Sequence, residues 1–298
     1  MRRVYSYSKE KWNQCDLLLV HNTSDAVPHN YAGTGRREVL VKLAAQVRLA
    51  PGRSISEQVA FLAGVGFEAV ELHSDAACAV AEYRAALQAT GVSALSMCPA
   101  DRGLDLVCDQ FTQRRRIQRT LRILDACNEL GVKTLISVPI RGALPESTAA
   151  EDEQDSYVYA LEQLAPAAES AGVTIVVEPL NRYETHLVNT LADACAIARR
   201  VASPAIKVLA DTFHMNIEET DLNGSIRVAG EWIGHVHLAD NHRAQPGTGS
   251  IGFTDVFAAL RDIAYLGSAA LECRLRGNPE QALEESVNYL VEARGESD

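Results

Sequence analysis

The sequence lacks any long uninterrupted hydrophobic run. No apolar stretch reaches the roughly 20 residues that a membrane-spanning helix needs. The N-terminal residues 1–8 contain two arginines but no apolar segment follows them, so they do not resemble a signal peptide. We therefore expect a cytoplasmic protein with no membrane partner.

Paired cysteines and an excess of positive charge are also lacking. The seven cysteines stand singly, without a Cys-x-x-Cys pair, and their number is odd. This pattern is typical of reduced thiols in a cytosolic protein. The net charge is −11, because 39 acidic residues outnumber 28 lysines and arginines. So acidic a chain argues against a nucleic-acid partner.

A glycine-rich dinucleotide-binding fingerprint is missing after the first apolar run, which disfavours an open doubly wound sheet. What is present instead, from about residue 41, is a regular alternation of short apolar runs and longer amphipathic segments. Eight such repeats predict an α/β fold, a closed (β/α)8 TIM barrel over residues 41–298. Residues 1–40 do not fit the repeat, and we expect them to form an N-terminal extension.

The expected elements follow the hydrophobic periodicity. The expected strands are residues 43–49, 69–72, 93–97, 134–138, 174–178, 207–211, 235–238 and 270–273. The expected helices are residues 56–63, 76–90, 111–130, 155–171, 190–201, 254–263 and 279–292.

Four polar residues stand at the ends of the last four expected strands: Glu178, Asp211, His237 and Glu272. Taken singly, each would be a helix cap or a core histidine. A charge beside a buried strand is costly unless it is paired or binds a metal, and barrel active sites lie at the carboxyl ends of strands. Four such residues at successive strand ends therefore predict one shared divalent cation. The oxygen-rich set suits Mn²⁺, Co²⁺ or Mg²⁺ better than a structural Zn²⁺.

The segments around these residues resemble a known family. EPLNRYETH (178–186), DTFHMNIEE (211–219) and HVHLADNHRAQPGTG (235–249) are similar to the D-tagatose/D-psicose (ketose) 3-epimerases, which belong to the xylose-isomerase-like sugar isomerase and epimerase barrels. The resemblance covers residues 41–293 and is strongest from Gly172 onward. The 40 residues before the barrel and the segment after the fourth expected strand depart from the family pattern.

The resemblance implies a set of roles. Glu178, Asp211, His237 and Glu272 would hold one metal ion, with Mn²⁺ preferred. Glu178 and Glu272 would act as acid and base on the two faces of the reacting carbon.

The remaining implied roles concern the sugar. His214 would be a further catalytic group, and Glu184, His214 and Arg243 would contact the substrate. Apart from the resemblance, Arg274 would add a cation to the barrel mouth if it shares a face with Glu272, and we expect it to bind the substrate there. The implied activity is isomerisation or epimerisation of a ketose by proton removal α to a carbonyl, through a metal-stabilised enediolate.

A lyase on the same barrel is the main alternative. The same proton removal would then be followed by β-elimination, either from a 3-keto-glycoside, including C-glycosides, or in a dehydratase. A DNA-repair endonuclease needs more histidines and a basic groove, and a non-catalytic scaffold would not need the full ligand set. We expect a small-molecule sugar substrate and a homo-oligomer, or a hetero-oligomer with a small subunit if the lyase alternative holds.

Overall fold

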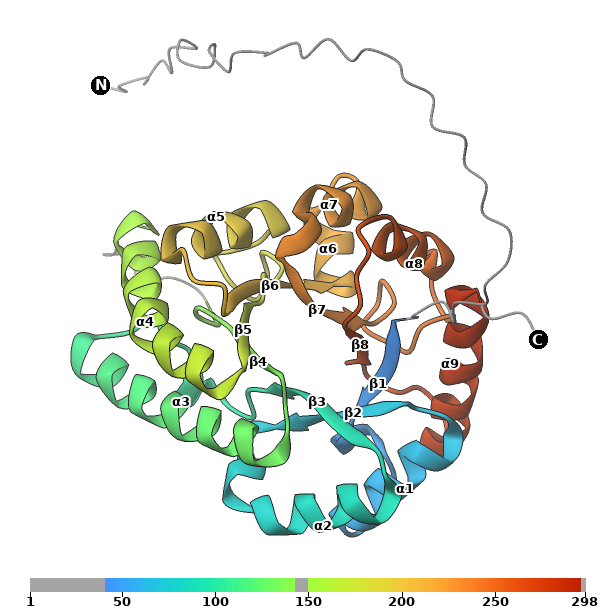
Figure 1. Ribbon diagram of the computed structural model, residues 1–298. Coiled ribbons are helices and arrows are strands. Elements are labelled where there is room, and N and C mark those ends of the chain that lie inside the picture. The colour runs from blue at the N-terminus through green and yellow to red at the C-terminus, as the bar shows by residue number, and fades with distance from the viewer. Residues whose placement is uncertain (1–40, 143–149, 296–298) are drawn as a thin grey trace, which may run out of the picture. The chain divides into compact units, whose positions relative to one another are not determined.

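The computed structural model describes residues 41–142 and 150–295. They form a closed barrel of parallel strands in sequence order, β1 to β8, with helices around it (Figure 1). β1 closes the barrel by pairing with both β2 and β8, and Ala44 faces Ala69 on one side and Ala270 on the other. The predicted fold class is therefore confirmed. The predicted N-terminal extension lies outside the described residues.

All eight expected strands are present, with boundaries that shift by a few residues. The strands are β1 (Lys42–Gln46), β2 (Ala69–His73), β3 (Ser93–Cys98), β4 (Thr134–Ser137), β5 (Thr174–Val177), β6 (Ile206–Asp211), β7 (Ile233–Leu238) and β8 (Ser268–Leu271). The second half of the first expected strand is a 3₁₀ turn, Val47–Leu49.

The helices cover the outside of the barrel (Figure 1). They are α1 (Ile55–Val65), α2 (Val80–Thr90), α3 (Gln110–Leu130), α4 (Ala150–Ala171), α5 (Leu191–Val201), α6 (Thr212–Glu218), α7 (Leu222–Ala229), α8 (Phe253–Asp262) and α9 (Pro279–Arg294). The short α6 and α7 were not among the expected helices. No helix within the described ranges is long and apolar enough to cross a membrane.

Apolar side chains fill the space between strands and helices. Tyr157, Leu161 and Leu164 on α4 are fully buried, as are Phe253 and Phe257 on α8. Burying one such side chain contributes roughly 1.5–3 kcal/mol. This packing holds the helices against the strands and fixes where each strand ends.

The inside of the barrel is divided between apolar and polar side chains. Cys98, Ile136, Val176 and Leu209 form an apolar cluster contributed by β3 to β6. The other side is polar, and its fully buried members are Gln46 on β1, Glu71 on β2, Ser96 on β3, and His235 and His237 on β7. Because buried polar groups need partners, this side of the interior must be held by hydrogen bonds.

Candidate metal centre and active-site pocket

Four side chains meet at the carboxyl ends of the last four strands. Glu178 directly follows β5, Asp211 ends β6, His237 lies in β7, and Glu272 directly follows β8. One ligand atom from each lies within 4.8 Å of those of the other three. The structure thus brings together all four residues predicted to hold a metal.

Asp211 has two separate tasks. Its Oδ1 caps the N-terminus of α6 by accepting the backbone N–H groups of Phe213 (2.8 Å) and His214 (3.3 Å). Aspartate is a favoured N-cap residue because its oxygen satisfies these otherwise unpaired donors. Capping locks the side chain, so Oδ2 is left pointing at the cluster, 3.7 Å from His237 Nδ1.

His237 shows that the cluster fits a cation. Its Nε2 lies 3.1 Å from both carboxylate oxygens of Glu71, which places a proton on Nε2. The buried Nδ1 has no hydrogen-bond partner within the described part of the chain. It faces Glu272 Oε2 at 2.9 Å, and Glu178 Oε1 and Asp211 Oδ2 at 3.6 and 3.7 Å. A lone pair surrounded by carboxylates is repelled unless a positive charge lies between them.

The electrostatics support the same conclusion. Burial opposes a charge on His237, but the nearby carboxylates of Glu71 and Glu272 outweigh it and hold the pKa of the imidazole well above its ordinary value. The cluster therefore attracts positive charge strongly. Three carboxylates and one imidazole are ligands that Mn²⁺, Co²⁺ and Mg²⁺ accept.

Glu71 orients His237 from behind, and sequence reasoning missed it. Its carboxylate accepts hydrogen bonds from Gln46 Nε2 (2.8 Å) and Ser96 Oγ (2.7 Å) and lies 2.8 Å from His235 Nε2. Burial raises the pKa of Glu71, but His237 and His235 outweigh burial and hold this pKa well below its ordinary value. A carboxylate on the far nitrogen of a ligating histidine is a common second partner in metal sites.

Glu71, His235 and His237 also lie close enough together to suggest a metal site of their own. Gln46 and Ser96, however, already donate to the Glu71 oxygens. The group is therefore a hydrogen-bond network behind the first cluster. A sequence signal for this network does exist: Gln46, Glu71 and Ser96 are polar residues within the apolar strands β1, β2 and β3. The predicted metal ligands were sought among polar residues at the ends of strands and not within them.

Arg243 neutralises the cluster from the side of the pocket. Its guanidinium lies 2.6 Å from Asp211 Oδ2 and 2.5 Å from Glu272 Oε2, and it stacks on the Phe213 ring at 4.8 Å. Burial opposes ionisation of both carboxyls, yet Arg243 lowers the pKa of Asp211 to about 2 and holds that of Glu272 well below its ordinary value. Glu178 forms no direct ion pair with Arg243 within the described residues, and burial raises its pKa.

The loop after β7 holds Arg243 in place. Arg243 has a φ of +60°, an uncommon conformation for a residue with a side chain. Its N–H donates to the Asp240 carbonyl (2.8 Å), and the buried Asp240 carboxylate accepts the N–H groups of Gly249 (2.7 Å) and Ile251 (3.1 Å). A Cβ at position 249 would collide with the side chains of Asp240 and Asn241. Glycine is therefore required for this close approach.

His214 is buried in a defined tautomer. The Asn181 backbone N–H donates to its Nδ1 (3.1 Å), and Asn181 Nδ2 is 2.8 Å from the same atom. Nδ1 therefore acts as an acceptor and the neutral ring carries its proton on Nε2, which lies 3.9 Å from Asp211 Oδ2. His214 is accordingly built to donate a hydrogen bond toward the cluster. This geometry disfavours His214 as the base in the lyase alternative.

A cavity of about 360 Å³ opens beside the cluster. It contains three of the four predicted substrate contacts, Glu184, Arg243 and Arg274. Its lining residues are Arg48, Glu184, Phe213, His242, Arg243, Glu272, Cys273 and Arg274. Arg48, Phe213, His242 and Cys273 were not predicted. Such a volume lies at the lower end of small-molecule sites, about 300–1,000 Å³, so the cavity suits a small substrate.

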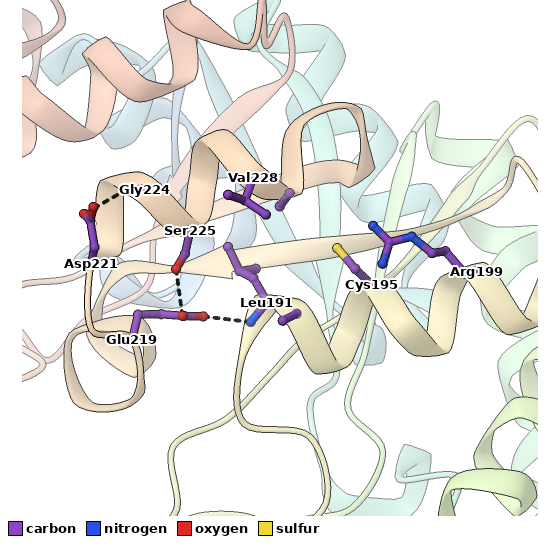
Figure 2. A pocket seen from close by; sticks show the side chains of 10 residues that line it. Leu191, Cys195, Arg199, Glu219, Asp221, Gly224, Ser225 and Val228 are labelled. Carbon is purple, nitrogen blue, oxygen red and sulfur yellow. Dashed lines mark hydrogen bonds between the residues drawn. The ribbon is translucent and has the colours of Figure 1, made fainter. Parts of the chain in front are cut away.

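A second cavity, of about 350 Å³, lies between α5 and α7 on the outside of the barrel (Figure 2). Its carboxylates have nearby donors: Glu219 accepts from Leu191 N–H (2.8 Å) and Ser225 Oγ (2.7 Å), and Asp221 caps α7 through Gly224 N–H (2.9 Å). These bonds join helices to one another. They leave no convergent set of ligands comparable with the barrel mouth.

Comparison with known sequences identifies relatives with named activities. The family model described as xylose isomerase-like TIM barrel matches residues 59–293. The chain is 32% identical to 3-dehydro-D-guloside 4-epimerase of Escherichia coli K12 over 249 residues, which cover 80% of this chain and 94% of that protein. It is 43% identical to D-psicose 3-epimerase of Enterocloster bolteae over 112 residues, 38% of this chain and 37% of that protein.

Solved structures agree in fold. The structure of 3-keto-D-glucoside 4-epimerase from E. coli matches with a TM-score of 0.80 and 28% identity, covering 84% of this chain and 98% of that one. D-psicose 3-epimerase from Clostridium cellulolyticum H10 matches with a TM-score of 0.78 over 85% and 99% of the two chains, and at 22% identity it shows the fold alone. The predicted family is confirmed: this chain belongs to the xylose isomerase-like TIM barrel family.

Proposed function

We propose that the protein is a divalent-metal-dependent epimerase that inverts a carbon next to the carbonyl of a keto sugar. The observation that carries the proposal is the convergence of Glu178, Asp211, His237 and Glu272 on one point at the edge of a small polar cavity. The two named relatives are also epimerases, one of a 3-dehydro sugar and one of a ketose. Both names place the inverted carbon beside a carbonyl.

The order of the strands explains how inversion works. Glu178 and Glu272 come from β5 and β8, the two outermost of the four strands that supply ligands. They therefore approach the site from two sides, and a sugar carbon between them has a carboxylate on each face. One glutamate removes the α-proton, and the other returns a proton from the opposite face.

Two donors stabilise the charge that develops. Arg243 lies at the cavity wall, and the Nε2–H of His214 is directed toward the cluster. Both suit a sugar oxygen that gains negative charge as the C–H bond breaks. A divalent cation held by the four ligands would supply Lewis acidity that makes this C–H bond more acidic.

Deuterium exchange tests the proposal directly. The metal-loaded protein is incubated in D₂O with D-fructose, D-tagatose, D-psicose and methyl 3-keto-glucoside, and NMR follows the carbons next to each carbonyl. We expect deuterium at one of these carbons together with the epimer. An absence of exchange with every sugar would contradict the proposal, and an enone product would indicate the lyase alternative.

The metal preference, the homo-oligomer and the cytoplasmic location stay predictions. Metal analysis of the purified protein tests the metal preference, with Mn²⁺ expected ahead of Co²⁺ and Mg²⁺. Analytical ultracentrifugation tests the homo-oligomer.

A further inference from the structure

Three arginines line the cavity, and two of them, Arg48 and Arg274, are not needed to pair with the carboxylates of the metal cluster. Arg243 is engaged by Asp211 and Glu272, as described above. Arg274 also lines the cavity, but its guanidinium forms no hydrogen bond or ion pair among residues 41–142 and 150–295, and only its backbone N–H is bonded, to the Arg243 carbonyl (2.6 Å). An unpaired guanidinium beside a catalytic cavity is available to a ligand.

Arg48 lines the cavity as well. Its Nε donates to Gln46 Oε1 (3.0 Å), and its Nη2 lies 3.6 Å from Glu272 Oε1. Glu272 already has closer partners in Arg243 and His237, at 2.5 and 2.9 Å. Arg48 is therefore anchored at Nε while the outer part of its guanidinium has only a distant partner.

The other carboxylate of the cavity forms no ion pair with these two cations within the described residues. Glu184 is the one other carboxylate in the lining, and its Oε1 accepts from Asn181 Nδ2 (3.1 Å). His242 also lines the cavity, and its buried Nδ1 has no hydrogen-bond partner within the described ranges. Arg274 and the outer part of the Arg48 guanidinium are thus left without a close acceptor among the described residues of the cavity.

We propose that the substrate is an anionic keto sugar, with an oxyanion, a carboxylate or a phosphate, bound by Arg274 and Arg48 away from the reacting carbon. The inference rests on the proposed function and names the substrate class of the same site. Arg274 is exposed and the Arg48 side chain is 54% exposed, so water solvates both guanidinium groups in the free protein. A neutral sugar that covered them would displace this water without supplying a counter-charge, which is unfavourable. The planar fork of arginine matches a carboxylate or phosphate with two parallel hydrogen bonds.

Matched substrate pairs test this inference. D-tagatose and D-tagaturonate differ only at C6, as do D-fructose and D-fructuronate, and D-fructose 6-phosphate provides the phosphate arm. We expect kcat/KM to be at least about tenfold higher for the acid or the phosphate than for its neutral partner, because one charge-assisted interaction has about that effect. Whichever anion gains more identifies the source of the oxyanion. Exchange at equal rates with neutral and anionic sugars would overturn the inference and leave the epimerase intact.

Two arginine variants test whether Arg274 causes the preference for an anionic sugar. Arg274→Gln should lower kcat/KM for the anionic sugar about tenfold more than kcat/KM for its neutral partner. Arg276→Gln is the matched control, because Arg276 is exposed on the same segment and does not line the cavity. An unchanged preference in Arg274→Gln would contradict the assignment.

A binding measurement tests the anion site independently of the proposed epimerase activity. Calorimetric titration with D-gluconate, which cannot epimerise, requires no turnover. Weaker D-gluconate binding in Arg274→Gln than in Arg276→Gln supports the anion site even if no sugar exchanges deuterium. Equal binding to both variants counts against the site.

Discussion

Carboxylates occur both at the barrel mouth and in the second cavity, the α5–α7 groove, but their partners differ. In the groove, Glu219 and Asp221 accept hydrogen bonds from backbone and hydroxyl donors of neighbouring helices. At the mouth, Glu178 and Glu272 face Asp211 and the Nδ1 of His237, which has no hydrogen-bond partner in the described part of the chain. The carboxylates of the second cavity are matched by neutral donors, whereas three carboxylates that meet within 4.8 Å keep an excess of negative charge even with Arg243 beside them, which favours a cation.

Metal removal should have the largest effect, and it should act on the barrel mouth and not on the α5–α7 groove. Dialysis against a chelator should abolish deuterium exchange, and added Mn²⁺ should restore it, because in the proposed function a bound cation would make the C–H bond more acidic. The melting temperature should also fall, since a ligand at 100 times its Kd stabilises the folded state by about 2.7 kcal/mol. Full exchange activity in the metal-free protein would contradict the assignment of the mouth.

Glu272→Gln should have the next largest effect. It keeps the shape of the side chain but removes one negative ligand and one proton-transfer group. We expect kcat to fall by about 10²–10⁴-fold and metal affinity to weaken. Exchange rates and calorimetric metal titration measure the two effects, and circular dichroism checks the fold. Wild-type turnover in this variant would refute the role of Glu272.

Glu71→Gln should weaken the metal site without touching the ligands. Removing the charge behind His237 should lower metal affinity about 10–100-fold, as is usual for a second partner of a ligating histidine. Ser96→Ala removes a single donor to Glu71 and should have a smaller effect in the same direction. Metal titration of both folded variants measures this, and unchanged affinity in Glu71→Gln would show that His237 needs no such support.

Glu219→Gln applies the chemical change of Glu272→Gln to the groove and should have the smallest effect. It weakens the bonds to Leu191 N–H and Ser225 Oγ, so the free energy of unfolding should fall by about 1 kcal/mol. Urea denaturation measures that loss, and exchange activity should remain that of the wild type. A loss of activity as large as that of Glu272→Gln would erase the distinction between the two regions.

Several features were within reach of sequence reasoning because they are local. The apolar periodicity predicted the barrel, and polar residues at strand ends identified Glu178, Asp211, His237 and Glu272 as a group. α6 and α7 were missed because helices of seven and eight residues leave little periodic signal. Glu71 was missed because its partner His237 is 166 residues away: a polar residue within an apolar strand indicates a buried polar group but does not say which distant residue it contacts.

The sequence by itself determined the fold class and which side chains stand at the ends of strands, because both depend on a repeat of two residues in strands and 3.6 in helices. Only the tertiary structure decided that Glu71 meets His237 across the barrel, that His214 carries its proton on Nε2, and that Arg48 and Arg274 share one cavity. These facts depend on closing the barrel, which brings inward-facing residues of distant strands within hydrogen-bond distance.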